Sequence, residues 1–101
     1  MRLFSTCGIM SDPAVPRTVV VANRAGMHAR VAVLIATVAR GFKAKVLITK
    51  GLHQVEATDV LQLLSLGAAP GERLSLEADG QDALQALDAV EQLFLRKFDE
   101  D

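Results

Sequence analysis

The residues best suited to chemistry lie between Asn23 and Arg30. In this stretch a loop that contains Gly26 enters a predicted helix at His28. The first backbone amides of a helix have no partner within the helix and carry the positive end of its dipole, so they form a site for anions. The same dipole disfavours protonation of a histidine, and a neutral imidazole keeps a lone pair and is a nucleophile. His28 is therefore a candidate acceptor of a phosphoryl group.

A phosphoryl group on His28 would be held without a metal. Its oxygens would lie over the amides of Ala29, Arg30 and Val31, within reach of the Arg30 guanidinium, and each charge-assisted contact is worth about 1.5–3 kcal/mol. Gly26 allows a positive φ and a close approach of the backbone. A single histidine at a helix start is more often a cap or a structural residue, so spacing alone leaves both interpretations open.

Composition limits the protein to a few broad classes. The chain has 101 residues, a net charge of -1 and a hydrophobic fraction of 50%, which indicates one small globular domain. It has 11 basic and 12 acidic residues without a basic run or interleaved aromatics, which argues against nucleic-acid binding. No apolar run approaches the roughly 18 residues that a membrane span needs. The single cysteine, Cys7, indicates a reducing, cytoplasmic setting and no cysteine metal site.

The periodicity of apolar residues predicts the elements that must position His28. Residues 29–40 fit both a strand and a helix, and we favour the helix because of its length, its alanines and a left-handed cap at Gly41. Apolar alternation and turn signals predict the remaining elements. These are strands at 18–22, 43–49 and 52–57, with a turn at Lys50 and Gly51, a short helix at 59–67, a strand at 73–79, and a last helix capped by Asp82 with a stripe from Ala83 to Phe98.

The order βαββαβα predicts an α+β fold with helices on one face of a four-stranded, mainly antiparallel sheet. We expect residues 1–16 to form a disordered tail, residues 17–98 to form the domain, and the acidic residues 99–101 to fray.

Several motifs in combination resemble the HPr family, the histidine-containing phosphocarriers of the bacterial phosphoenolpyruvate-dependent phosphotransferase system. They are residues 26–30, Phe42, residues 65–67, Gly71 and residues 79–82, within a similarity that runs without a gap from about residue 19 to residue 98. The resemblance implies an open-faced sandwich that acts as a phosphocarrier in a sugar transport relay and not as an enzyme. It implies phosphorylation of His28 on Nδ1, with Arg30 contacting the phosphate.

The resemblance also implies the partners. Enzyme I would donate the phosphoryl group, enzyme IIA domains would accept it, and a regulatory protein is a further candidate partner. It implies a monomer without cofactor or metal. The docking surface implied by the family comprises Met27, Ala29, Val60, Leu61 and Leu64, although these apolar residues could equally belong to the core.

Two positions depart from the family pattern. Val31 stands where most members have proline, and we expect a slightly looser first helical turn with its amide free to bind an anion. Asp59 stands where many members have a serine that a kinase phosphorylates as a regulatory mark. Asp59 excludes that modification and is explained either as a helix N-cap or as a permanent phospho-like charge.

Two other functions compete with the phosphocarrier. One is a regulatory binding module of HPr form with little or no phosphoryl transfer, in which the negative charge of Asp59 imitates a phosphorylated residue. The other is a small-ligand regulatory domain of similar layout. His53 is expected to be an exposed strand residue without metal-ligand partners. Ser65 and Ser75 have no recognisable paired base, which argues against a conventional hydrolase.

Overall fold

The computed structural model describes residues 16–100, so nearly all of the predicted 1–16 tail, together with Cys7, lies outside the described residues. The elements follow the predicted order. They are β1 (Arg17–Val20), α1 (Ala29–Arg40), β2 (Lys45–Lys50), β3 (His53–Glu56), α2 (Val60–Ser65), β4 (Arg73–Asp79), α3 (Ala83–Leu95) and a terminal 3-10 turn, η1 (Lys97–Asp99).

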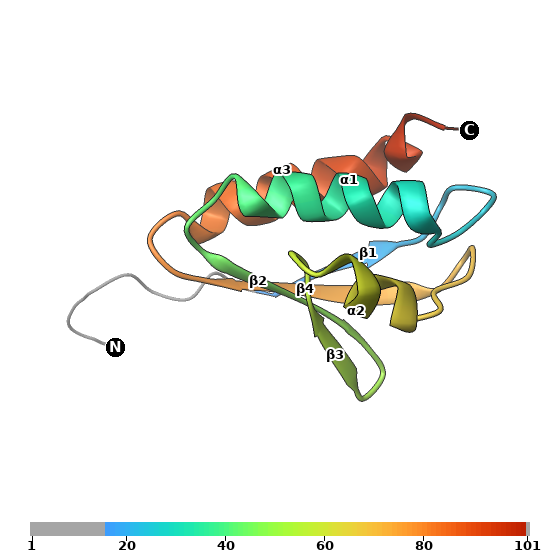
Figure 1. Cartoon of the computed structure of the whole chain (residues 1–101), viewed down its shortest axis with the longest axis horizontal. Helices are drawn as coiled ribbons and strands as arrows, with labels where there is room; N and C mark the ends of the chain where they lie inside the picture. The colour runs from blue at the N-terminus through green and yellow to red at the C-terminus, as the bar shows by residue number, and fades with distance from the viewer. Residues whose placement is uncertain (1–15, 101) are drawn as a thin grey trace.

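The four strands form one sheet in the order β1-β4-β2-β3, and every neighbouring pair is antiparallel. Figure 1 shows α1 and α3 lying side by side over one face of this sheet, with α2 below α1 and beside β3. The predicted α+β sandwich and the choice of helix for residues 29–40 are confirmed. No described helix is long and apolar enough to span a membrane.

Alternation along the strands sorts side chains between the core and the outer face. In β4, Leu74, Leu76 and Ala78 are buried while the residues between them are more exposed. The buried face of α1, which includes Val31 and Ile35, packs on the same apolar core. Apolar burial is the main stabilising term in a domain of this size, so the sheet and α1 form a firm support for the loop before His28.

Some predicted details differ in the structure. Gly41 ends α1 with a φ of -75°, so the predicted left-handed cap was wrong. The hairpin turn consists of Gly51 and Leu52, because Lys50 still pairs with His53. This shift by one residue follows from the positive φ of 61° at Gly51, which suits the first position of a two-residue turn.

The third helix also differs at both ends from the prediction. Asp82 is the N-cap by position, but its carboxylate accepts hydrogen bonds from the backbone amides of Lys43 and Ala44, at 2.9 and 2.7 Å. Those amides belong to another loop, so Asp82 joins two loops instead of capping its own helix. At the other end α3 stops at Leu95, and Phe98 reaches the core from a separate turn.

Candidate functional site

His28 occupies the N-cap of α1 with an extended backbone, and its side chain makes no capping hydrogen bond. The first helical hydrogen bond runs from Ala32 N to His28 O at 2.9 Å. The amides of Ala29, Arg30 and Val31 therefore precede the first helical bond and have no acceptor within the helix. The Val31 side chain is buried in the core, so only its backbone amide is a candidate contact for an anion.

Gly26 fixes the approach of the loop to the helix. Its φ is 71°, and a Cβ at this position would lie 2.9 Å from Ala68 O. The loop is tied to the same carbonyl by a hydrogen bond from Met27 N at 3.0 Å. A residue other than glycine would be strained here both by its φ and by this contact.

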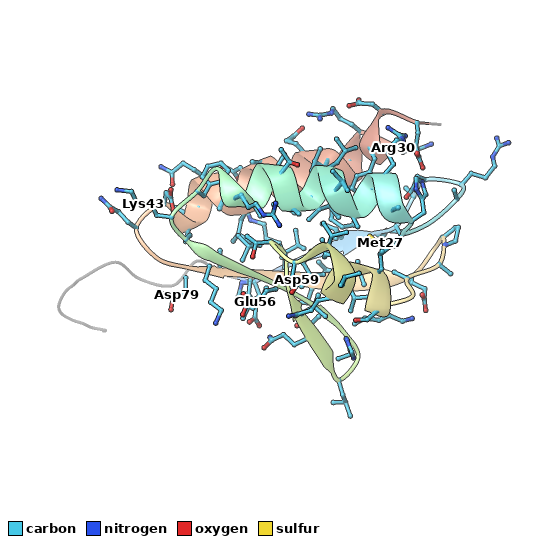
Figure 2. All side chains as sticks on the ribbon, in the orientation of Figure 1. Met27, Arg30, Lys43, Glu56, Asp59 and Asp79 are labelled. Carbon is cyan, nitrogen blue, oxygen red and sulfur yellow. The ribbon has the colours of Figure 1, made fainter. Side chains whose placement is uncertain are left out.

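The end of the chain contributes an acidic side chain to the site. Glu100 Oε1 accepts hydrogen bonds from Asn23 Nδ2 at 2.8 Å and lies 3.0 Å from His28 Nε2. Its Oε2 lies 3.1 Å from His28 Nε2 and forms an ion pair with Arg30. In Figure 2 the labelled Arg30 lies beside the final turn of the chain. His28, Arg30 and Glu100 thus form one cluster, although about 70 residues separate Arg30 from Glu100.

These contacts set the protonation of Glu100. Hydrogen bonds from His28, then Asn23 and Arg30, hold the pKa of Glu100 down to about 2, against an ordinary value of 4.5. Its side chain is 18% exposed and that of His28 is 34% exposed. An ionised carboxylate therefore lies beside a histidine that another protein can still reach.

Comparisons with known proteins identify the family to which the chain belongs. A family model described as the PTS HPr component phosphorylation site matches residues 15–95. The chain belongs to the HPr family of phosphocarriers. The phosphocarrier protein HPr of Treponema pallidum (strain Nichols) is 39% identical over 87 residues, which are 86% of this chain and 99% of that protein.

A relative named NPr and a solved HPr structure are also similar to this chain. The phosphocarrier protein NPr of Escherichia coli (strain K12) is 41% identical over 88 residues, covering 86% of this chain and 98% of that protein. The crystal structure of HPr-C-His from Thermoanaerobacter tengcongensis has a TM-score of 0.83 and 31% identity, and the match covers 87% of this chain and 99% of that one. HPr members therefore share both sequence and fold with this chain over nearly their full length.

The structure adds two residues to the candidate site, Glu100 and Asn23, that sequence reasoning missed. The fraying expected for residues 99–101 stays a prediction, and within the described residues Glu100 contacts the side chains of Asn23, His28 and Arg30. The sequence analysis gave Asn23 no role of its own, yet it is fully buried and donates both to Gly26 O, at 2.8 Å, and to Glu100. The buried Phe98, in line with the apolar stripe of α3, was the available signal that the end of the chain is anchored.

Asp59, the other position that departs from the HPr pattern, caps α2. Its carboxylate accepts a hydrogen bond from Gln62 N at 3.1 Å, as the capping-box pattern predicts. The reciprocal bond of a capping box, from the Asp59 backbone amide to the Gln62 side chain, is replaced, because Gln62 Oε1 accepts a hydrogen bond from Glu56 N instead. Helix capping therefore accounts for Asp59 without a further role.

The candidate docking residues differ in exposure. Leu61 is 77% exposed, whereas Met27, Val60 and Leu64 are partly buried and pack against the core. Figure 2 shows Met27 between the start of α1 and α2, close to the loop that carries His28. Docking at these residues stays a prediction.

His53 has a neighbour that the sequence did not indicate. Its Nε2 lies 3.2 Å from Ser65 Oγ, so the expectation that Ser65 has no paired base was wrong. The Ser65 hydroxyl donates to Gln62 O at 2.6 Å, however, which directs its proton away from the imidazole. A nucleophilic serine needs its proton on the base, so this exposed pair lacks the geometry of a hydrolase.

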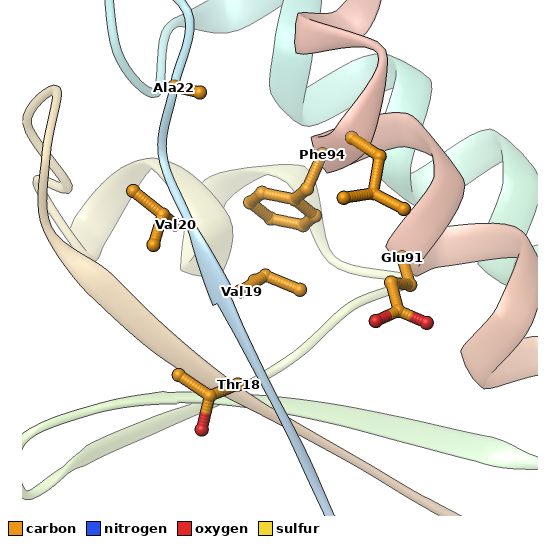
Figure 3. A pocket seen from close by; sticks show the side chains of 7 residues that line it. Thr18, Val19, Val20, Ala22, Glu91 and Phe94 are labelled. Atoms are coloured by element: carbon orange, nitrogen blue, oxygen red, sulfur yellow. The ribbon is translucent and has the colours of Figure 1, made fainter.

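Two other kinds of candidate site lie apart from His28. Within residues 16–100 no group of three or more His, Cys, Asp or Glu side chains is arranged to hold a metal. A hollow of about 260 Å³ opens between β1 and α3 (Figure 3) and is mainly apolar. Its one charged side chain, Glu91, already pairs with Arg17 at 2.9 Å, so the convergent polar groups of a metabolite site are not present there.

Proposed function

We propose that this chain carries phosphoryl groups in a phosphoenolpyruvate-dependent phosphotransferase system for sugar uptake. It accepts the group on Nδ1 of His28 from phospho-enzyme I and passes it to an enzyme IIA domain. The chain stays a carrier throughout, because the phosphohistidine is a transient intermediate between two partner proteins.

The observation that carries the proposal is the arrangement at the start of α1. His28 is the N-cap residue, but its imidazole makes no capping bond, so a purely structural role as a cap does not explain it. The amides of Ala29, Arg30 and Val31 precede the first helical bond, and the Arg30 side chain is 54% exposed beside them. A nucleophile, amides without an acceptor within the helix, and a guanidinium at one helix end suit a phosphoryl dianion.

The transfer step uses these groups in a simple way. The lone pair of Nδ1 attacks phosphorus while the bond between phosphorus and the donor protein breaks, and the donor atom keeps that electron pair. The amides and Arg30 stabilise the negative charge on the phosphoryl oxygens, which is the main contribution a protein makes to phosphoryl transfer. The side chains of His28 and Arg30 are 34% and 54% exposed, so an acceptor protein can reach the group and remove it again.

The test is phosphorylation of the purified full chain. The protein is incubated with phosphoenolpyruvate, magnesium and enzyme I from the same source, and its intact mass is recorded before and after mild acid. His28→Ala is run in parallel, and His53→Ala is the matched control because these are the two histidines of the chain. We expect one acid-labile phosphoryl group in wild type and His53→Ala and none in His28→Ala.

The relatives carry two names, HPr and NPr, at similar identity of 39% and 41%. The assay therefore uses each enzyme I that the source organism encodes. A well-folded wild-type protein that stays unphosphorylated, with an enzyme I proven active on another HPr, would refute the carrier and favour a regulatory binding module.

A further inference from the structure

The C-terminal turn is built so that Glu100 returns to the start of α1. Phe98 is fully buried and packs edge-on against Phe94, with ring centroids 4.8 Å apart. Lys97, Phe98 and Asp99 all have left-handed backbones, with φ of 55°, 56° and 59°. Consecutive residues other than glycine rarely adopt this conformation unless other contacts impose it, and strained backbone of this kind gathers at functional sites.

The partners of Glu100 define which atoms carry protons. Its pKa of about 2 keeps the carboxylate ionised at neutral pH, so both oxygens can only accept hydrogen bonds. His28 Nε2 lies 3.0 and 3.1 Å from the two oxygens and must therefore be the donor. In a neutral imidazole with its proton on Nε2, the lone pair is on Nδ1.

We propose that Glu100 is a positioning residue for His28: its carboxylate holds the Nε2–H tautomer and turns Nδ1 outward as the phosphoryl acceptor. This role deepens the proposed function and rests on it. Asn23 completes the arrangement, because its buried amide links the loop before His28 to the carboxylate. The same logic applies wherever a carboxylate orients a catalytic imidazole.

Glu100 also acts on the charge that develops during transfer. When Nδ1 forms its bond to phosphorus, the bond between phosphorus and the donor protein breaks and the donor atom keeps that electron pair. The His28 ring keeps its proton on Nε2. The ring therefore gains positive charge, which the carboxylate on the Nε2 side stabilises. Because Glu100 contacts Nε2, its hydrogen bonds do not occupy Nδ1, and the His28 side chain is 34% exposed.

The first test reads the tautomer in the unphosphorylated full chain and needs no partner protein. Nitrogen-15 NMR above the ordinary titration range of histidine reports which ring nitrogen of His28 is protonated, and proton exchange reports how firmly the proton is held. We expect one tautomer in wild type, with a slowly exchanging Nε2 proton. Glu100→Ala and Glu100→Gln should give fast exchange and a mixture of tautomers.

Asp99→Asn is the matched control. Asp99 lies on the same turn, but its carboxylate pairs with Arg96 at 3.3 Å. This variant should keep the wild-type spectrum of His28. Identical tautomer ratios and exchange rates in wild type and Glu100→Ala would overturn the proposal.

The second test measures the rate of phosphoryl transfer from enzyme I. Loss of one charge-assisted hydrogen bond to the reacting ring should slow acceptance by Glu100→Ala about tenfold, while Asp99→Asn stays at the wild-type rate. Faster acceptance by Glu100→Ala would mean that the carboxylate blocks the site, and would refute the positioning role. If wild type fails to accept phosphate but shows the predicted tautomer, the carrier proposal fails and the positioning of His28 stands.

Discussion

The anchoring of the C-terminal turn leads to a quantitative prediction about two phenylalanines. Phe94 and Phe98 are both buried and touch at an interplanar angle of 68°. Truncation of a core phenylalanine to alanine costs about 3–5 kcal/mol. Phe94 lies within α3, where the backbone cannot relax, so Phe94→Ala should cost this full amount.

Phe98→Ala should cost less, because its backbone has strain to release. Each residue other than glycine in a left-handed conformation costs roughly 1–2 kcal/mol, and three such residues adjoin here. Once the ring of Phe98 is removed, the turn can unwind and recover part of that strain. We therefore expect a net loss of about 1–3 kcal/mol from Phe98→Ala, roughly 2 kcal/mol less than from Phe94→Ala.

The assay is equilibrium unfolding in urea followed by far-UV circular dichroism, because the chain has no Trp or Tyr for intrinsic fluorescence. The free energies of unfolding of wild type and both variants are compared at the same temperature. A Phe98→Ala loss equal to or greater than the Phe94→Ala loss would show that the turn stores no releasable strain. The explanation for the position of Glu100 would then be wrong.

Three further predictions concern the loop, the short helix and the end of the chain. Gly26→Ala should destabilise the fold by about 1–3 kcal/mol in urea unfolding, because it strains a φ of 71° and places a Cβ 2.9 Å from Ala68 O; an unchanged midpoint would contradict this. Asp59→Ala should cost about 0.5–2 kcal/mol as a lost cap, whereas Asp59→Ser should keep both stability and the rate of transfer from enzyme I. A faster rate for Asp59→Ser would favour a phospho-like role. The lowered pKa of Glu100 stabilises the fold above pH 4.5, and this contribution should be lost as Glu100 is protonated between pH 4.5 and about 2. The NMR shifts of His28 should change over the same pH range as Glu100 is protonated. Glu100→Gln should lack this change.

Much of the fold could be predicted because it depends on local patterns. The alternation of Leu74, Leu76 and Ala78 fixes the buried face of β4. The capping bond of Asp59 follows from its spacing to Gln62. Such signals lie within a few residues of one another, so the sequence displays them directly.

The errors fall where distant segments decide the conformation. Asp82 has the type and place of a helix cap, but the amides of Lys43 and Ala44 take its carboxylate. Ser65 acquires His53 as a neighbour because α2 packs near the hairpin. Tertiary contacts of this kind override local preference, and periodicity does not reveal them.

In the candidate site, too, the residues close together in the sequence could be predicted and the distant ones could not. His28 and Arg30 could be named because they share one short stretch with Gly26. Glu100 could not, since an acidic end usually frays, and the left-handed turn that redirects it has no glycine to mark it. Asn23 was hidden for a related reason, because its role depends on the carboxylate that arrives from the end of the chain.

The most direct test of the central claim is NMR of the phosphorylated chain with nitrogen-15 in its imidazoles. Coupling between phosphorus and a ring nitrogen identifies the phosphorylated atom, and the second nitrogen shows whether it keeps its proton. We predict a phosphoryl group on Nδ1 of His28 with the proton retained on Nε2. A phosphoryl group on Nε2, or on any residue other than His28, would contradict both the assigned acceptor and the role of Glu100.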